Sequence, residues 1–500
     1  MRPNVLLVMA DQFRSDCMGC AGNSAIRTPY LDELACQGVR FSNAYSAVPS
    51  CIPARSIMMS GMDQWHTGVL GMGPGMGKMP DNFAHTLPGE FAAAGYHTQG
   101  IGKMHFSPQR ALNGFHNTII DEGGRVEDPG FVSDYRKWFE ENKPGKMGYR
   151  DHSVGWNSWM ARPSHLPEWL HSTNWTVDET VNFIHRRDPH KPFFLKVSFN
   201  RPHSPYDPPQ VYYDMYKNEK LPEPSYGDWD DINLDEREAQ KTDAWRGKIS
   251  DRDIRDARAA YYGSITHVDH QIGRLFYEMK KAGVYEDTII LFISDHGDML
   301  GDHNLWRKTY AYEGSARIPF ILRVPYQCQL PKGSVIDKVV ELRDVMPTLL
   351  DAAGLEIPDC CDGSSVMPLL KGEQVQWREA IHGEHSLCYH PDQENHFVTD
   401  GFYKLVWLDN PNIWQFFDLK KDPDETHNAI QDPEYQEIIG RFKAFLYEDL
   451  AKRDGVLARD GKFFPKENAL NLKSPNYGVY ACRQDSEYRV VAPGDDVSTL

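Results

Sequence analysis

Cys51, Pro53 and Arg55 combine a thiol, a rigid backbone and a permanent positive charge in a short stretch. Pro53 fixes its own φ and disfavours a helical Ile52, so we expect Cys51 at a turn before a helix that starts near Ala54. The positive end of that helix would face a group held at Cys51, and the guanidinium of Arg55 suits an oxyanion. The spacing predicts a site for a small, highly charged anion. The plain alternative is a buried structural cysteine.

Polar side chains follow four apolar segments, 5–10, 96–101, 192–199 and 288–293. Such runs are typical of strands inside a parallel sheet. The polar residues that follow them are Asp11, Gln12, Lys103, His105, His203, Asp295 and His296. Because the carboxyl ends of parallel strands meet at one edge of a sheet, we expect these side chains to lie together. Each one alone would be equally typical of a helix cap or a surface group.

The strand ends also predict a metal site. Asp11, Gln12 and Asp295 offer oxygen ligands, and His296 adds a ring nitrogen. A mainly oxygen donor set suits Ca²⁺, our first expectation, or Mg²⁺, and the histidine keeps Mn²⁺ and Zn²⁺ open. Because the net charge of the chain is −17, clustered Lys, Arg and His must make an anion site locally positive.

Several motifs resemble those of the type I sulfatases, in the alkaline phosphatase superfamily. These motifs are Cys51-x-Pro53-x-Arg55 with Gly61, then 102–105, 202–205, 294–298 with Lys308, and finally 417–419 with 422–428. Ile52, Ser60 and Met104 depart from the family's usual residues. The resemblance covers most of the chain. It implies an α/β fold with a large mixed, mostly parallel sheet sandwiched by helices and a smaller C-terminal α+β domain that carries an antiparallel sheet.

The resemblance further implies that Cys51 is oxidised to formylglycine, the nucleophile once hydrated. The implied metal ligands are Asp11, Gln12, Cys51, Asp295 and His296. The implied catalytic residues are Cys51, Arg55, Lys103, His105, His203 and Lys308. Arg55 and the two lysines would stabilise charge on the sulfuryl oxygens. His203, with Lys308, would protonate the leaving alcohol, and His105 would take a proton from the remaining hydroxyl.

We expect two domains, a catalytic domain over 1–372 and a smaller domain over 373–500 that completes the substrate pocket. Apolar residues at helical spacing predict a helix over 259–281. The stretch 121–174 is rich in Trp, Gly and Pro and predicts long inserted loops. The charged stretch 227–256 predicts a solvated surface excursion.

The smaller domain carries signals of both strand and helix. Two apolar strands flank Asp400 and Gly401, a combination that predicts a hairpin. The stretch 434–453 predicts a helix.

Composition limits the partners. The net charge of −17 argues against nucleic acid and an anionic membrane as partners. The sequence contains no apolar run long enough for a transmembrane helix and no signal peptide, so we expect a cytoplasmic protein, or a periplasmic one if the chain was trimmed. An odd count of 9 cysteines favours reduced thiols. The expected partners are a small sulfated substrate and a formylglycine-generating or anaerobic sulfatase-maturating enzyme, and a homo-oligomer stays open.

The predicted function is hydrolysis of a sulfate ester. The tryptophan-rich insert favours a carbohydrate sulfate over an aryl sulfate. One alternative is a phosphonate monoester or phosphodiester hydrolase of the same superfamily, because many sulfatases carry an Asp where this chain has Gln12. Another is a catalytically inactive, metal-stabilised binding protein with an unmodified Cys51.

Overall fold

The large sheet is built from the apolar segments that the sequence marks as buried strands. The computed structural model of the chain describes residues 2–72, 78–80, 82–122, 130–325, 330–386, 388–390, 393–465, 474 and 476. The sheet has the strand order β5-β4-β6-β1-β7-β8-β2-β9. The strands are β5 (Asn117–Ile120), β4 (His97–Gly102), β6 (Phe193–Pro202), β1 (Asn4–Asp11), β7 (Thr288–Ser294), β8 (Phe320–Arg323), β2 (Val39–Phe41) and β9 (Ser334–Ile336). The first five are mutually parallel, and β8 is antiparallel to both of its neighbours. The predicted mixed, mostly parallel sheet is confirmed.

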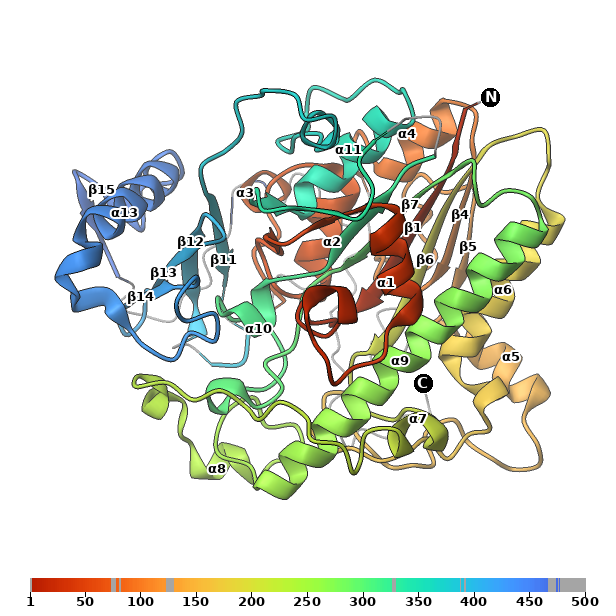
Figure 1. Cartoon of the computed structure of the whole chain (residues 1–500), viewed down its shortest axis with the longest axis horizontal. Helices are drawn as coiled ribbons and strands as arrows, with labels where there is room; N and C mark the ends of the chain where they lie inside the picture. Colours follow the sequence, from red (N-terminus) through yellow and green to blue (C-terminus); the bar gives the residue numbers. More distant parts are fainter. Residues whose placement is uncertain are drawn as a thin grey trace.

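Helices cover both faces of this sheet (Figure 1). One face packs against α1 (Pro29–Gln37), α6 (Ser172–Arg186) and α9 (Asp251–Lys281). The other face packs against α2 (Cys51–Ser60), α4 (Leu87–Ala93) and α11 (Val345–Ala352). Strand β1 supplies both cores, since alternate side chains of a strand point to opposite faces. Leu6 and Val8 lie in one core, and Val5 and Leu7 lie in the other.

The C-terminal part of the chain forms a second, antiparallel sheet, as expected. Its strands, in order, are β11 (Ile381–His385), β12 (Asn395–Thr399), β13 (Tyr403–Leu408) and β14 (Ile413–Asp418). The predicted hairpin joins β12 to β13, and the predicted helix is α13 (Gln436–Ala451), which packs on one face of the sheet. The opposite face packs against the larger domain. A domain boundary at 372/373 stays a prediction, and residues 477–500 lie outside the described part.

The remaining elements are short. They are α3 (Gln64–Thr67), α5 (Asp134–Asn142), α7 (Gln210–Asp214), α8 (Glu236–Ala239), α10 (Glu313–Ala316), α12 (Met367–Leu370), β3 (Ala44–Tyr45), β10 (Val340–Glu341), β15 (Ala458–Arg459) and β16 (Lys462–Phe463). No helix among the described residues is long and apolar enough to cross a bilayer.

Helix α9 begins earlier than the predicted range 259–281. Its first residue is Asp251, and the side chain of Ser250 accepts the backbone N–H of Asp253. A serine cap with acidic residues in the first turn stabilises a helix start without any apolar residue. The apolar periodicity alone could not locate that start.

The prediction of a solvated excursion over 227–256 holds only in part, since most of its residues are exposed or half-buried but several are buried. Trp229 and Trp245 are each only 8% exposed, and the ring of Trp229 stacks on that of Tyr312 at 4.6 Å. These two indoles anchor the segment to the core between the domains although the residues around them are charged.

The prediction of inserted loops over 121–174 holds only in part. Helix α5 lies inside this stretch, capped by the hydroxyl of Ser133, and Phe139 of this helix is buried. Residues 123–129 lie outside the described part. The helix is short, and its apolar residues are too few to stand out from the surrounding Trp, Gly and Pro.

A buried ion cluster joins the second sheet to the larger domain. The Nζ of Lys404, on β13, lies 2.6 Å from Glu313 Oε1 and 2.9 Å from Glu425 Oε1. The Lys404 side chain is 0% exposed and that of Glu425 is 2% exposed. A buried charge that loses its partner is strongly destabilising. Lys404 therefore stabilises the contact between the second sheet and α10.

We expect the Lys404→Met substitution to lower the free energy of unfolding by about 3–5 kcal/mol, because it leaves the buried carboxylate of Glu425 without its cation, whereas Glu313 keeps Arg317. Urea unfolding followed by tryptophan fluorescence measures the change. The control is Lys421→Met, whose ion pair with Glu434 lies on the surface and should contribute below about 1 kcal/mol. Equal losses in the two variants would contradict a special role for the buried cluster.

Candidate active site

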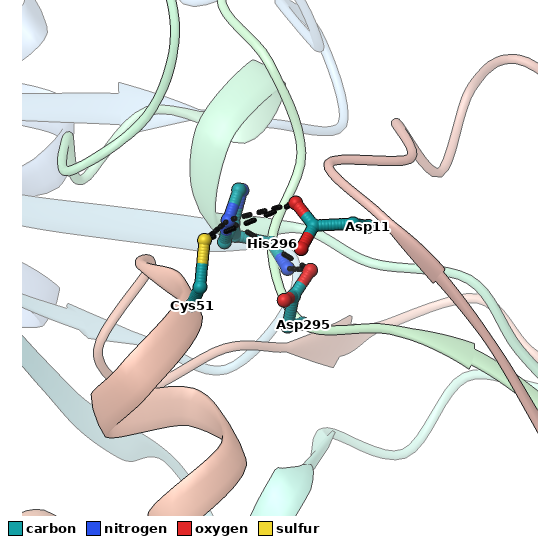
Figure 2. Close-up of side chains that lie close together, drawn as sticks. All are labelled: Asp11, Cys51, Asp295 and His296. Carbon is teal, nitrogen blue, oxygen red and sulfur yellow. Dashed lines mark hydrogen bonds and ion pairs between the residues drawn. The ribbon is translucent and has the colours of Figure 1, made fainter. Parts of the chain in front are cut away.

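The carboxyl ends of β1 and β7 bring two carboxylates next to the start of α2 (Figure 2). Asp11 ends β1, Asp295 and His296 follow β7, and Cys51 is the first residue of α2. The Cys51 Sγ lies 3.2 Å from His296 Nε2 and 3.8 Å from Asp11 Oδ1. None of the four side chains is more than 1% exposed. The structure thus brings together four of the predicted residues, which we call the Cys51 cluster.

The helix that carries Cys51 starts at this residue and not near Ala54 as predicted. Pro53 is the third residue of α2. Proline is tolerated in the first turn of a helix because the N–H that it lacks would have no partner inside the helix. Cys51 therefore lies in the first turn itself, where the positive end of the helix dipole is strongest.

Arg55 connects the strand ends beneath the cluster. Its Nε donates to Asp295 Oδ2 at 3.0 Å, and its second terminal nitrogen lies 3.1 Å from Asp11 Oδ2. The other terminal nitrogen donates to the Lys103 carbonyl at 2.7 Å and to Ser198 Oγ at 3.1 Å. Protein atoms surround a side chain that is 1% exposed. These contacts make Arg55 a positioning residue, and its predicted contact with sulfuryl oxygens stays a prediction.

Two lysines lie on either side of the cluster. The Lys103 Nζ lies 2.6 Å from Asp11 Oδ2. The Lys308 Nζ lies 2.7 Å from His203 Nε2 and 2.9 Å from Gln12 Oε1. The other ring nitrogen of His203 donates to the Ser204 carbonyl, so Nε2 accepts the proton of the lysine.

The positive charges set the protonation states of the site. Burial raises the pKa of Asp11, but Lys103 and Arg55 outweigh it and hold this pKa well below its ordinary value. Burial raises the pKa of Cys51, whereas Lys308 and Lys103 bring it down to about 7. Burial, with the neighbouring Lys308, holds the pKa of His203 well below its ordinary value. His203 is therefore neutral, and its Nε2 accepts a hydrogen bond from Lys308 Nζ.

The donor atoms of the Cys51 cluster fit a divalent cation. Asp11 and Asp295 each use Oδ2 to contact Arg55, while their Oδ1 atoms lie 3.8 and 3.7 Å from His296 Nε2. The Nδ1 of His296 donates to the Gly297 carbonyl, which leaves Nε2 with a lone pair. All donor atoms of the cluster lie within 4.8 Å of one another. Carboxylate oxygens with one imidazole are a donor set for Ca²⁺, Mn²⁺ or Mg²⁺.

Gln12 and His105 follow their strands in a left-handed backbone conformation, with φ of 65° and 60°. Such conformations in residues other than glycine are rare and gather at functional sites. The Nε2 of Gln12 donates to Asp298, and its Oε1 already accepts from Lys308. The backbone N–H of His105 donates to Glu122. Gln12 as a metal ligand and His105 as a base stay predictions.

Sequence reasoning gave no role of their own to Asp298 and Ser198, and it offered His385 only as a residue that could line the substrate rim. Asp298 accepts from both Gln12 and Tyr206, and its place in the 294–298 motif was a usable signal. Ser198 accepts from Arg55 but lies inside an apolar strand. The Nε2 of His385 lies 2.8 Å from the Oγ of Ser50, the residue before α2. His385 comes from β11 of the second sheet, so its contact with the residue before the Cys51 helix joins segments far apart in the sequence.

Comparison with known proteins points in one direction. A family model described as Sulfatase matches residues 3–355, and a model for the C-terminal part of N-sulphoglucosamine sulphohydrolase matches residues 301–452. An arylsulfatase of Clostridium perfringens is 45% identical over 91% of this chain and 95% of its own length. An N-acetylglucosamine-6-O-sulfatase of Bacteroides thetaiotaomicron is 26% identical over 87% of this chain and 84% of its own length.

A solved structure shares the fold. The phosphonate monoester hydrolase of Agrobacterium radiobacter superposes with a TM-score of 0.76 at 24% identity, over 90% of this chain and 96% of that one. This likeness concerns the arrangement of helices and strands.

We expect the purified protein to bind a divalent cation at the Cys51 cluster. Asp295→Asn should weaken the affinity at least about tenfold, because an amide oxygen replaces a charged ligand. Metal content after dialysis and titration calorimetry measure the loss. The control is His303→Gln, since His303 is buried between Trp229 and Tyr312 rather than in the cluster. Unchanged metal binding in Asp295→Asn would contradict the assignment.

Proposed function

Because the chain belongs to the sulfatase family and is a sulfuric ester hydrolase, we propose that it releases sulfate from a carbohydrate sulfate ester, with a nucleophile made from Cys51 beside a divalent cation. The observation that carries the proposal is the buried Cys51 thiol among Asp11, Asp295 and His296 with a lysine on each side. A catalytic anion site needs positive charge where the substrate oxygens lie, and the two lysines supply it.

The nucleophile would be formylglycine made from Cys51 by a formylglycine-generating or anaerobic sulfatase-maturating enzyme. In this conversion the Cβ of Cys51 would become the aldehyde carbon, and an oxygen would replace its Sγ. When hydrated, formylglycine supplies a hydroxyl as the nucleophile and a second hydroxyl that allows the aldehyde to re-form.

The metal would be held by Asp11, Asp295 and His296, with Gln12, whose side-chain oxygen accepts from Lys308, as a further proposed ligand. When bound, a divalent cation supplies Lewis acidity at an oxygen of the substrate. The chain itself adds Lys103 next to Asp11. The positive charge of Lys103 would stay available to a sulfuryl oxygen, because a single carboxylate oxygen uses only one of its three N–H groups.

The leaving alcohol would be protonated by the pair of His203 and Lys308. Their nitrogens lie 2.7 Å apart, and Nδ1 of His203 is fixed by the Ser204 carbonyl. The pKa of the imidazole is lowered, so His203 would be neutral, and Lys308, which donates to Nε2 of His203, would supply the proton that the imidazole passes to the leaving oxygen. His105 would then remove the proton of the remaining hydroxyl on residue 51, so that the aldehyde re-forms and sulfate departs.

A sugar as leaving group is supported by the pocket beside His203. The ring of Trp156 lies 5.7 Å from that of His203, and the pocket around it is lined with arginines and carboxylates as well as aromatic rings. Polar side chains beside an aromatic ring suit a hydroxylated ring better than a purely apolar aryl group. The relative named for N-acetylglucosamine 6-sulfate adds support.

The second candidate is a phosphonate monoester or phosphodiester hydrolase. Gln12, which bonds to Lys308 and Asp298 in place of a further carboxylate, is the observation that favours it. Rates on nitrophenyl sulfate and on a nitrophenyl phosphate diester separate the two functions. A much faster diester would overturn the sulfatase proposal.

We expect Cys51→Ala to abolish sulfate release from sulfated monosaccharides, measured by ion chromatography of free sulfate. The matched control is Cys17→Ala, which removes a buried thiol from the core on the opposite face of the sheet and should keep the activity. Mass spectrometry of the peptide that contains residue 51 should show the aldehyde in protein from the native host. A persistent thiol in an active enzyme would contradict the proposed nucleophile.

We expect His203→Ala to lower kcat on a sugar sulfate by about 10²–10⁴, the usual range for loss of a general acid. On nitrophenyl sulfate the loss should be below about tenfold, because a nitrophenolate needs no proton to leave. Parallel steady-state assays with both substrates give the ratio. The same loss on both substrates would place His203 in binding rather than in proton transfer.

A further inference from the structure

The pocket beside His203 reaches further than the leaving oxygen requires. It is an open pocket between the end of β6 and the loop that carries Tyr149 and Trp156, with about 640 Å³ of space between its atoms when the open solvent at its mouth is included. Asn200 and Arg201 of β6 line its inner side. Trp156 connects this pocket to the catalytic groups, since Lys103 lies 6.0 Å from its ring centroid.

Arg150 presents a positive charge that no carboxylate of the described residues neutralises. Its guanidinium lies 5.4 Å from the ring centroid of Tyr149 and 5.8 Å from that of Trp156. Both rings hold the cation by their negative faces, which leaves its N–H groups for other partners. The residue is half-buried at the wall of the pocket. A guanidinium held in this way is preorganised for a planar or tetrahedral anion.

The acidic residues of the pocket are engaged elsewhere. Asp207 accepts from Arg201 Nε at 2.7 Å. Asp121 accepts from the side-chain amide of Asn200. Glu122 accepts the backbone N–H of Met104, on the catalytic side. None of these contacts involves Arg150.

Asn200 offers a second, independent sign of a ligand. It is 5% exposed, and its Nδ2 donates to the carbonyl of Asp121 at 3.1 Å. Its Oδ1 is buried and has no hydrogen-bond donor among the described residues. A buried acceptor without a donor is costly. A hydroxyl or N–H group of a bound sugar would remove that cost.

We propose that Arg150 binds a second anionic group of the substrate, a carboxylate or a second sulfate, and that Asn200 Oδ1 accepts a hydroxyl or N–H of the same sugar. The inference rests on the proposed function and narrows its substrate class to acidic or multiply sulfated saccharides. Arg150 and Lys103 each lie within about 6 Å of the Trp156 ring, so one mono- or disaccharide reaches both. Arg150 is thus a specificity-determining residue that takes no part in the bond cleavage.

The test compares matched substrates. Each monosulfated glucosamine or galactosamine is compared with the same sugar bearing a second sulfate. Each monosulfated disaccharide in which the neighbouring sugar is glucose is compared with the disaccharide in which it is glucuronate. The wild-type enzyme should prefer the doubly charged member of at least one pair. Arg150→Gln should lower kcat/KM for that member by about 10- to 100-fold, the effect of one charge-assisted hydrogen bond, mainly through KM. It should change the singly charged member less than about threefold.

Three further variants complete the design. Arg150→Lys keeps the charge and should recover part of the preference. Asn200→Asp turns the acceptor into a charged neighbour of the anion and should raise KM for the doubly charged member most. Lys137→Gln removes an exposed charge from the same region without lining the pocket and should leave both members unchanged.

The outcomes separate the two levels of the proposal. If the wild type releases sulfate from no saccharide, the proposed function fails and the inference with it. If it hydrolyses singly charged sugars as well as doubly charged ones, the function stands and the inference is overturned. Equal losses on both members in Arg150→Gln would likewise overturn it. Thermal unfolding of each variant confirms that the loss does not come from the fold.

Discussion

The buried ion pairs of Arg55 with Asp11 and Asp295 are the interaction on which the site depends. The two carboxylates lie at the ends of β1 and β7, neighbours in the sheet, and carboxylates this close repel each other unless a cation lies between them. One guanidinium provides that cation and also binds the backbone after β4. Because all groups are buried, each contact is worth more than it would be in water. The parallel sheet delivers the strand ends, and Arg55 of α2 fixes their spacing and the place of Cys51.

The charges around this centre divide into separate tasks. The Oδ2 atoms of Asp11 and Asp295 contact Arg55, and that of Asp11 also contacts Lys103. Their Oδ1 atoms face Nε2 of His296. On the other side, Lys308 contacts His203 and Gln12 and no carboxylate of the described residues. A chain with a strongly negative net charge therefore contains a positive corner deep in its fold. That corner attracts an anion at short range, where the repulsion of the distant surface is screened.

The sequence was a good guide where one strong pattern decided the structure. Continuous apolar runs located β1, β6 and β7, and their polar ends indicated Asp11, His203 and Asp295. It was a poor guide where the cause lies far away along the chain. The start of α9 depends on a serine cap, the burial of Trp229 depends on rings from another segment, and Lys404 of β13 meets Glu313 of α10. Arg150 stands in a stretch without any period, so its position between two rings was not predictable.

Cys51 and Ile52 are each only 1% exposed, which has a consequence for when residue 51 can be modified. In the folded chain both residues belong to α2 and are packed beneath the sheet. If a separate enzyme alters residue 51, as proposed above, it would have to reach that residue before the core closes. A chain that folded first would then keep its thiol, so the rate of folding and the supply of the modifying enzyme would together set the active fraction of the protein.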